Sequence, residues 1–319
     1  MRNRLPFVLA AVGLLAAGLT ACQATIPGAP GCSAFPADNV WHAPVATLPV
    51  HARSAAFVNN IGSTAGAHAD FGSGLYDGGP IGIPYTTVAG SQAKVPVTFQ
   101  YASESDPGPY PIPADAPIEG GADSTGDRHV LVVDRDNCKL YELFSAYHQT
   151  DGSWQAGSGA IFDLKSDALR TDTWTSADAA GLAILPGLVT YDEVASGHVD
   201  HAIRITVPVS STSYLWPARH QAGSTSDPNM PPMGLRLRLK SSIDPNAYPA
   251  SVRPIIVALK TYGGIVADNG APWFLSGVPD SRWDNDALHQ LGRIKGSDWQ
   301  AVDESSLQVS ANSGQARTP

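Results

Sequence analysis

Three acidic residues near the middle of the chain could supply the chemistry of glycan cleavage. Glu104 and Asp106 lie in a proline-rich stretch that ends at Pro113, and Glu119 follows beside two glycines. Prolines stiffen a loop, and a stiff loop can hold a carboxylate in a fixed position. Glycoside hydrolysis uses two carboxylates, one as the acid and the other as base or nucleophile. We therefore predict Asp106 and Glu119 as catalytic residues, with Glu104 and Tyr110 as substrate contacts. Turn capping by the same acidic residues is the alternative.

Histidines form a second group of candidates, because His129 and His201 each stand at the start of a predicted strand. If the two strands place them in one cleft, a histidine or a tyrosine could abstract the proton alpha to a uronate carboxylate, as a lyase mechanism requires. We predict both histidines as catalytic. Alternatively, each histidine fills a polar niche at the end of its own strand. The further candidates for substrate contacts are Arg128, Arg204, Trp216 and His220, with Arg219 as another partner for a substrate carboxylate.

A metal-dependent hydrolase is a second alternative. It would need at least two of His129, His201 and His220 within coordination reach of an acidic residue such as Asp127. The sequence has no short ligand spacing that favours such a site. It also lacks a phosphate-binding loop, a Gly-x-Ser-x-Gly elbow, a His-Glu-x-x-His motif and a dinucleotide fingerprint. We therefore predict no metal and no cofactor.

Tryptophans in loops could serve as platforms for sugar rings, since an aromatic face stacks on the apolar face of a sugar. Trp154, Trp174 and Trp216 are flanked by Gly, Ser, Thr or Pro, which are typical of loops. The alternative for each of them is a place in the hydrophobic core.

The elements that position these residues are predicted to be mostly β-strands, because only 15% of residues are charged while 31 glycines and 26 prolines interrupt the chain. We expect a two-sheet sandwich of jelly-roll type with a few peripheral helices. The predicted strands are 94–101, 128–134, 139–146, 202–208, 233–240 and 264–268. Those at 128–134 and 139–146 should form a hairpin, and Asn269-Gly270 should turn a second one.

Leucine and basic residues alternate from 233 to 240, so Leu235, Leu237 and Leu239 should share the core face of a strand. Arg236 and its basic neighbours should then face solvent or line an electropositive groove. Helices are predicted at 54–61, 249–262 and 284–295, where an apolar stripe is bounded by capping residues. The folded domain should span residues 32–304, followed by a disordered tail at 305–319 that lacks apolar periodicity.

The beginning of the chain resembles an export signal. Arg2 and Arg4 precede an apolar run that is too short to span a membrane permanently, and small residues lead to Cys22. This pattern is similar to the processing site of bacterial lipoproteins. We predict a signal peptide at 1–21, lipidation of Cys22, a tether at 22–31, and an extracytoplasmic protein anchored to the bacterial cell membrane. An ordinary secretory signal, and hence a secreted protein, is the alternative.

The two remaining cysteines, Cys32 and Cys138, are predicted to form a disulfide, which is typical of an oxidising compartment. The chain carries a formal net charge of −9, and removal of Arg2 and Arg4 with the signal would make it more negative. Such a surface repels phosphate backbones, so we expect no nucleic-acid partner.

Several long segments of the chain are similar to a group of uncharacterised exported bacterial proteins. They include ESDPGPYPIP at 104–113, DRHVLVVDRDNC at 127–138 and WTSADAAG at 174–181, and the resemblance extends over most of residues 39–304. It implies a single integral domain, but it implies no activity and no catalytic residue.

Together, export, a β-rich frame, aromatic loops and closely spaced carboxylates predict a carbohydrate-active enzyme that acts on an extracellular or cell-envelope polysaccharide. It would be a glycoside hydrolase or a polysaccharide lyase. The leading alternative is a non-catalytic glycan-binding or cell-envelope lipoprotein, which would use the same aromatic residues but keep its carboxylates apart.

Overall fold

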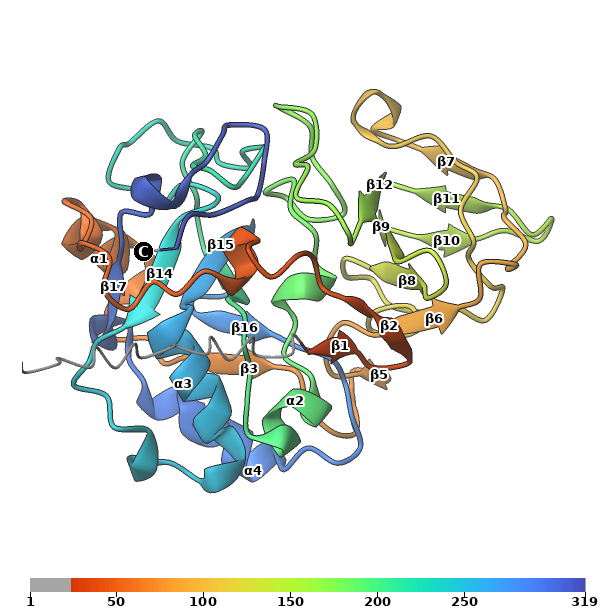
Figure 1. Cartoon of the computed structure of the whole chain (residues 1–319). Helices are drawn as coiled ribbons and strands as arrows, with labels where there is room; N and C mark the ends of the chain where they lie inside the picture. Colours follow the sequence, from red (N-terminus) through yellow and green to blue (C-terminus); the bar gives the residue numbers. More distant parts are fainter. Residues whose placement is uncertain (1–23, 319) are drawn as a thin grey trace, which may run out of the picture.

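Two mixed β-sheets, each with parallel and antiparallel strand pairs, form the framework of the protein (Figure 1). The computed structural model describes residues 24–318, so the predicted signal peptide and the lipidation of Cys22 lie outside the described residues. Within residues 24–318, no helix is long and apolar enough to cross a membrane.

The larger sheet has six strands in the order β17-β14-β15-β13-β16-β3. β13 lies near its centre, parallel to β15 and antiparallel to β16, and β3 continues the sheet parallel to β16. The bounds are β3 (His68–Asp70), β13 (Ile203–Val207), β14 (Arg236–Leu239), β15 (Gly264–Asn269), β16 (Phe274–Ser276) and β17 (Trp299–Ala301).

The smaller sheet has four strands in the order β12-β9-β8-β6, and a three-stranded sheet, β10-β11-β7, packs beside it. The first consists of β6 (Tyr85–Val88), β8 (Val130–Asp134), β9 (Lys139–Phe144) and β12 (Ser158–Asp163). The second consists of β7 (Val97–Phe99), β10 (Tyr147–His148) and β11 (Trp154–Ala156). Two short hairpins complete the strands: β1 (Thr25–Ile26) with β2 (Ala29–Ser33), and β4 (Leu75–Tyr76) with β5 (Gly79–Pro80).

The four-stranded sheet is buried on both faces, which explains the continuous apolar run in β8. Leu131 and Val133 join the main core, to which the six-stranded sheet also contributes, whereas Val130 and Val132 join a second core together with Trp154. Successive side chains of a strand point to opposite faces, so β8 reaches both cores. This layering confirms the prediction of a mostly β sandwich.

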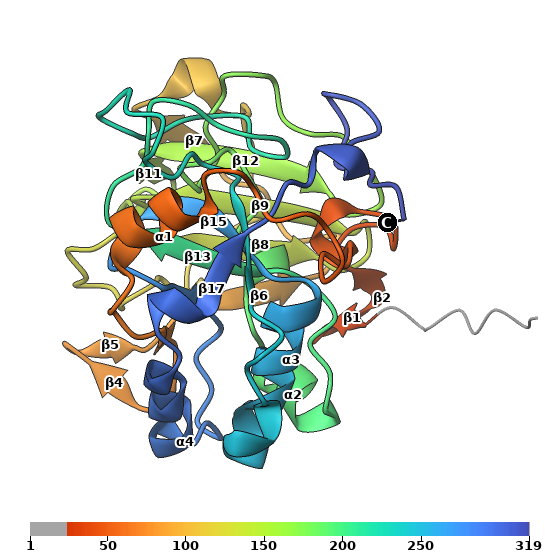
Figure 2. The same cartoon turned by 90° about the vertical axis from the view of Figure 1, so that its left-hand side faces the viewer.

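Helices lie at the periphery, as the sequence predicts (Figure 2). They are α1 (Ser54–Gly62), α2 (Tyr191–Ser196), α3 (Arg253–Thr261) and α4 (Asn285–His289). The helices predicted at 54–61, 249–262 and 284–295 correspond to α1, α3 and α4, with single 3-10 turns flanking α3 and α4. The sequence prediction missed α2, although Thr190 and Glu193 form a capping box at its start.

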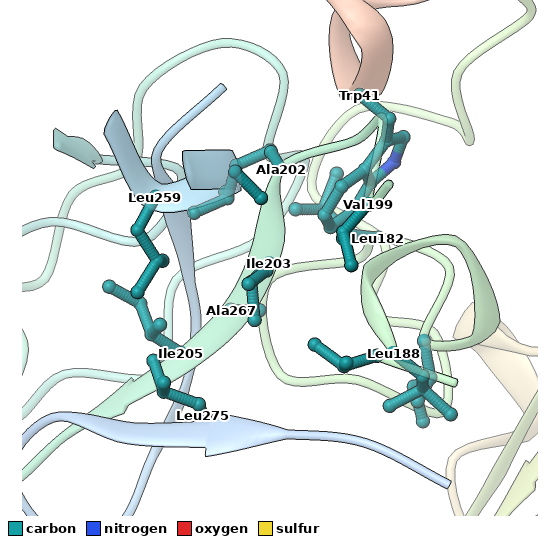
Figure 3. Packing of buried hydrophobic residues seen from close by; sticks show 14 of the residues in the cluster. Trp41, Leu182, Leu188, Val199, Ala202, Ile203, Ile205, Leu259, Ala267 and Leu275 are labelled. Carbon is teal, nitrogen blue, oxygen red and sulfur yellow. The ribbon is translucent and has the colours of Figure 1, made fainter. Parts of the chain in front are cut away.

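The core around β13 shows why this strand is rigid (Figure 3). Ile203 and Ile205 are fully buried on its apolar face, and Leu275 of β16 and Leu259 of α3 belong to the same cluster. Arg204 therefore projects from the opposite face of a strand whose backbone is fixed by packing.

The basic residues of β14 do not face solvent or line a groove as predicted. Arg236 is buried, donates a 2.9 Å hydrogen bond to Glu304 and also binds the carbonyl oxygen of Val40. Arg238 is buried as well. A second layer of chain covers this face, so both faces of β14 are interior.

All six predicted strands are present, and β8 and β9 form the predicted hairpin. The hairpin predicted at Asn269-Gly270 is wrong, because β13 lies between β15 and β16 in the sheet. The predicted disulfide is confirmed, with an S–S distance of 2.00 Å between Cys32 and Cys138. It joins β2 to the residue before β9 and so fastens the N-terminal hairpin to the four-stranded sheet.

Both predicted flexible ends are structured within the described residues. Residues 25–33 form the β1–β2 hairpin rather than a loose tether up to residue 31. In the predicted disordered tail, Gln308 and Ala316 form a bridge, and Ser313 accepts a 2.8 Å hydrogen bond from Trp216. Arg219 binds the carbonyl oxygen of Ala311. Apart from Leu307, which is buried in a small hydrophobic cluster, polar long-range contacts hold this segment, so apolar periodicity could not reveal its order.

Candidate functional site

A buried arginine marks the centre of the candidate site. Arg204 of β13 donates to both carboxylate oxygens of Asp178, at 3.0 and 2.8 Å, and to Asp268 at 2.9 Å. Its remaining nitrogen donates to the hydroxyl of Ser276 at 2.9 Å. A buried charge is stable only when it is paired and hydrogen-bonded, and this arginine is paired with two carboxylates.

The register of the sheet explains why these side chains meet. Ile205 pairs with Leu275 and Ser276 pairs with Asp70, so Arg204, Ser276 and Asp70 share the face opposite to the core. The register shift between β13 and β15 brings Asp268 opposite Thr206, on the same face. Polar residues from β3, β16, β13 and β15 therefore form one row across the six-stranded sheet.

A histidine and a glutamate from the other sheet approach this row. His129, immediately before β8, is 1% exposed, and its Nδ1 lies 2.6 Å from Oε2 of Glu119. Its Nε2 lies 3.0 Å from the carbonyl oxygen of Ala177. Since both ring nitrogens face acceptors, both carry protons and the ring is an imidazolium. The ion pair with Glu119 overcomes the burial of the ring and raises the pKa of His129 to about 9.

The segment WTSADAAG at 174–181 connects the two sheets at this point. Ala177 accepts from the ring of His129, and the next residue, Asp178, binds Arg204. Two residues further on, Ala180 donates its N–H to the carbonyl oxygen of Ala267 in β15. The residues on both sides of Asp178 are small, which lets the backbone approach both sheets closely.

A second buried acidic residue, Glu142, binds the loop that follows the connecting segment. Glu142 of β9 is fully buried and accepts hydrogen bonds of 3.0 Å from the backbone N–H groups of Ile184 and Leu185. Burial raises the pKa of Glu142 to about 7, and the charge of Asp178 adds to this effect. Glu142 therefore fixes the loop that follows the connecting segment.

A cavity of about 420 Å³ opens beside the polar row, with Asp70 on its wall. Asp70 reaches solvent and accepts no hydrogen bond from any residue between 24 and 318. The aromatic residues on the wall include Tyr76, which is 79% exposed, and Phe274, whose ring stacks on His68 at 4.3 Å between centroids. The cavity thus combines an unpaired carboxylate with aromatic surfaces, as sugar-binding sites do.

Two glycines bring the Glu119 turn against the β4–β5 hairpin. A Cβ atom on Gly79 of β5 would lie 1.9 Å from the carbonyl oxygen of Gly120, so only glycine permits the approach. The same hairpin carries Tyr76. Glu119, one residue before Gly120, is therefore held near this hairpin; it does not line the cavity itself, but its charge acts on the pKa of Asp70.

The pKa values of the two carboxylates are displaced in opposite directions. Burial raises the pKa of Asp70 and outweighs the lowering effect of His68, and the negative charge of Glu119 adds a smaller raising effect. The imidazolium of His129 outweighs the burial of Glu119 and lowers the pKa of that carboxyl. Burial also raises the pKa of Asp268 to about 6, against the opposing charge of Arg204. Carboxyl groups with opposite shifts are typical of acid and base pairs.

Asp106, predicted as the partner of Glu119, lies elsewhere. Its Oδ2 accepts from the guanidinium of Arg170 and, at 2.9 Å, from the N–H of Ile161. It lines a separate cavity of about 290 Å³ together with Trp174. Among the described residues no contact joins Asp106 and Glu119, so the structure gives the predicted pair no geometric support.

The other residues of the proline-rich loop secure its shape. The hydroxyl of the fully buried Tyr110 donates to the carbonyl oxygen of Asp106 at 2.8 Å, and Glu104 accepts from the N–H of Thr175 at 3.3 Å. Arg170 donates to the carbonyl oxygen of Glu104. These contacts correspond to the structural alternative for Glu104, Asp106 and Tyr110.

His201 and His220 do not share a cleft with His129. His201 is buried, with Nδ1 2.8 Å from the carbonyl oxygen of Ala202 and Nε2 3.3 Å from Glu193 of α2. Its pKa is raised by the charge of Glu193, which outweighs burial. His220 contacts the carbonyl oxygen of Ala179 at 2.9 Å. Within residues 24–318, no group of three or more His, Cys, Asp or Glu side chains could hold a metal ion.

The remaining predicted contacts are occupied by protein groups. Arg128 donates to the carbonyl oxygens of Ala122, Ser124 and Ala146. Arg219 donates to those of Arg170 and Ala311. Trp154 is buried in the second core, and Trp216 is partly buried and bound to the C-terminal segment. Of the predicted site residues, the structure brings Glu119, His129 and Arg204 together, and separately it places Nε2 of His220 3.9 Å from Glu104.

Sequence reasoning missed Asp70, Asp178 and Asp268. Asp178 and Asp268 lie in the segments SADAAG and VADNG, where an acidic residue stands between alanines and other small or turn-forming residues. Asp70 ends a strand of only three residues, which is too short for a periodicity signal. Comparison of the chain with protein family models, curated proteins and solved structures found no match, so a function can be argued only from this geometry.

Proposed function

We propose that this protein is an exported glycoside hydrolase that cleaves an uncharged polysaccharide, with Asp70 as general acid and Glu119 as nucleophile or general base. The observation that carries the proposal is the unpaired carboxylate of Asp70 on the wall of a 420 Å³ cavity, together with the charge of Glu119, which acts on the pKa of Asp70 and is held by an imidazolium. Glycosidic cleavage needs one protonated and one ionised carboxyl group on opposite sides of the scissile bond.

The electrostatics of the site support these roles. The raised pKa of Asp70 favours its protonated form, which the leaving oxygen of the sugar requires. A lowered pKa keeps Glu119 ionised, so that it can attack the anomeric carbon or activate water. His129 is a positioning residue in this scheme: as an imidazolium with both nitrogens bonded, it orients Glu119 and has no lone pair with which to accept a proton.

An uncharged substrate fits the charge around the cavity. Glu119 and Asp127 contribute negative charge there, as their effects on the pKa of Asp70 indicate, and they would repel a uronate or sulfate group. Arg204, Arg128 and Arg219 are bonded to protein groups and are not available to neutralise a substrate carboxylate. These contacts favour hydrolysis over elimination from a uronate.

A non-catalytic glycan-binding protein remains the second candidate, because Tyr76 and the stacked pair of His68 and Phe274 would bind sugar rings in either case. The two candidates differ in whether Asp70 and Glu119 act chemically. A binding module would retain full affinity and show no turnover.

The test is reducing-sugar release from a panel of uncharged polysaccharides by residues 24–319, compared with the variants Asp70→Asn and Glu119→Gln. Asp106→Asn is the matched control, because Asp106 is also a partly buried carboxylate on a loop but lies in another cavity. We expect both site variants to lose at least about 100-fold in kcat and the control to stay near wild type. Equal turnover by all four proteins would refute the assignment, and binding without turnover in the wild type would favour the binding module.

We also propose that Cys22 carries a lipid anchor that places the enzyme outside the cytoplasm. The support is the order of basic residues, apolar run and small residues before Cys22. Labelling of the full chain with a radioactive fatty acid should mark the wild type but not Cys22→Ala. Equal labelling of both chains, or release of unlabelled wild type into the medium, would contradict the anchor.

A further inference from the structure

A second hollow of about 360 Å³ lies on the three-stranded sheet, away from the cavity at Asp70. In Figure 1 this sheet stands at the upper right, on the opposite side of the molecule from α1 and α3. The side chains around the hollow include Thr98, Gln100, Ser145, Tyr147 and Gln155. They come from all three strands of the sheet and the loops next to them.

Strand register aligns three of these side chains in a row. Gln155 of β11 pairs with Thr98 of β7 on one side and with Tyr147 of β10 on the other. Paired residues point to the same face of a sheet, so a hydroxyl, an amide and an aromatic ring stand side by side. The neighbours of Gln155 in its strand, Trp154 and Ala156, are buried in the second core, which fixes the outward direction of the row.

The polar groups of this row have no protein partner. Between residues 24 and 318, no hydrogen bond uses the side chains of Thr98 and Gln155 or the hydroxyl of Tyr147. Gln100 and Ser145 also bond only through their backbones. The hollow therefore offers hydroxyl and amide groups of both donor and acceptor type, and no lining residue is charged.

A buried cation holds the aromatic ring of the row. The guanidinium of Arg128 lies 4.2 Å from the ring centroid of Tyr147, and three backbone carbonyl oxygens fix that guanidinium. Arg128 is only 4% exposed, so it serves as a rigid support for one face of the tyrosine. Tyr147 itself is 46% exposed and can contact a ligand.

The hollow is linked through the chain to the candidate catalytic residues. Ser145, on its rim, donates its N–H to the carbonyl oxygen of Asp127, and Arg128 follows next in sequence. Arg128 also binds the loop at 122–124 that leaves the Glu119 turn. His129 then reaches Glu119. One short segment, residues 127–129, thus connects the row at Tyr147 to Glu119.

We infer that this hollow is a subsite for uncharged sugar residues of the polysaccharide, bound several units away from the cleaved bond. This inference rests on the proposed function in one respect: the polysaccharide is the one that the proposed hydrolase cleaves. Uncharged hydroxyl and amide groups beside an aromatic ring match the hydroxyls and apolar faces of neutral sugars. An enzyme with such a subsite prefers long chains, because remote contacts contribute binding energy.

The test separates binding from catalysis by using Asp70→Asn, which retains the hollow. Isothermal titration with neutral hexasaccharides of β-1,4-linked glucose and of β-1,4-linked N-acetylglucosamine is compared with the same protein carrying Tyr147→Ala or Gln155→Ala. Tyr101→Ala is the matched control, because Tyr101 is equally exposed, at 47%, but does not line the hollow. We expect each hollow variant to weaken binding about tenfold and the control to match the parent.

Unchanged affinity after Tyr147→Ala and Gln155→Ala, or no binding of either hexasaccharide, would overturn the subsite. A loss of affinity in these variants supports the subsite even if the wild type hydrolyses no glycan. The titration therefore distinguishes failure of the subsite from failure of the proposed hydrolase activity. If wild type is active, Tyr147→Ala should raise KM for the polymer and leave kcat for a disaccharide substrate unchanged. The exposure of Tyr147 and Gln155 predicts native melting temperatures for both variants.

Discussion

His129 lies with one ring nitrogen 2.6 Å from Glu119 and the other 3.0 Å from the carbonyl oxygen of Ala177. The imidazole is thereby fixed as a cation between the Glu119 turn and the segment that joins the two sheets. Removal of one of its two N–H protons would leave either Glu119 or the carbonyl oxygen of Ala177 without its donor and would remove the positive charge opposite Glu119. The protonation of one histidine therefore couples the stability of the fold to the geometry of the site.

We predict that this histidine makes stability depend on pH above neutrality. Its pKa is raised from 6.5 to about 9 in the folded protein, so its contribution is complete below pH 6.5 and is lost as pH rises through about 9. A difference of this size corresponds to about 3 kcal/mol. Urea unfolding at pH 6 and at pH 9.5 should detect the fall in the free energy of unfolding, and His129→Gln should flatten it. If the free energy of unfolding falls equally with pH in the wild type and in His129→Gln, another group causes the pH dependence.

Activity should be greatest at acidic pH. Glu119 has a lowered pKa and must be ionised, whereas Asp70 has a raised pKa and must keep its proton. The rate should fall at low pH as Glu119 becomes protonated, and should fall again towards neutrality as Asp70 loses its proton. A profile of kcat/KM from pH 3 to 9 measures both limbs. A plateau that extends through pH 8 would be incompatible with Asp70 as the acid.

We predict that Glu142 is essential for the stability of the fold, because it is fully buried and accepts hydrogen bonds from two buried N–H groups. Glu142→Ala leaves the N–H groups of Ile184 and Leu185 buried without acceptors and creates a cavity in β9, at a cost of about 3–5 kcal/mol. Glu142→Gln keeps one acceptor oxygen and should cost less. Chemical unfolding of the three proteins at pH 6 measures the order, and equal stability of the alanine and wild-type proteins would contradict this role.

Reduction of the disulfide should destabilise the protein strongly. Cys32 and Cys138 are 106 residues apart, and a crosslink across a loop of this length contributes about 4–5 kcal/mol by restricting the unfolded chain. The melting temperature of the wild type should fall in dithiothreitol, whereas that of a Cys32→Ser, Cys138→Ser double variant should be low with or without reductant. A wild-type melting temperature that is insensitive to reduction would show that the hairpin is held by other contacts.

The strands of the fold could be predicted because their signal is local. The apolar run of β8 and the turn before Cys138 specify a strand and a hairpin within a dozen residues. The connection between β15 and β16 could not be predicted in this way. Asn269-Gly270 is typical of a hairpin turn, but insertion of β13 between the two strands depends on residues about sixty positions earlier.

The site was predicted in part for the same reason. The sequence singles out Glu119 and His129 separately, with Asp106 and His201 as their predicted partners, and does not predict the 2.6 Å contact between them. Asp70 takes its place in the polar row only through β3, which joins the edge of the larger sheet next to β16. Asp106 has the local features of a functional loop, yet Arg170 lies near it in the fold and satisfies its charge. Partners that are distant in sequence decide which carboxylates stay available.

The most direct test of the proposed roles of Asp70 and Glu119 is a comparison of leaving groups. Protonation by Asp70 is needed for a sugar leaving group but not for dinitrophenolate, which leaves without an acid. On the glycan that the wild type cleaves, we expect both Asp70→Asn and Glu119→Gln to lose at least about 100-fold in kcat/KM. On the dinitrophenyl glycoside, Asp70→Asn should recover most of its activity and Glu119→Gln should not. Wild-type rates for both variants on both substrates would contradict the account.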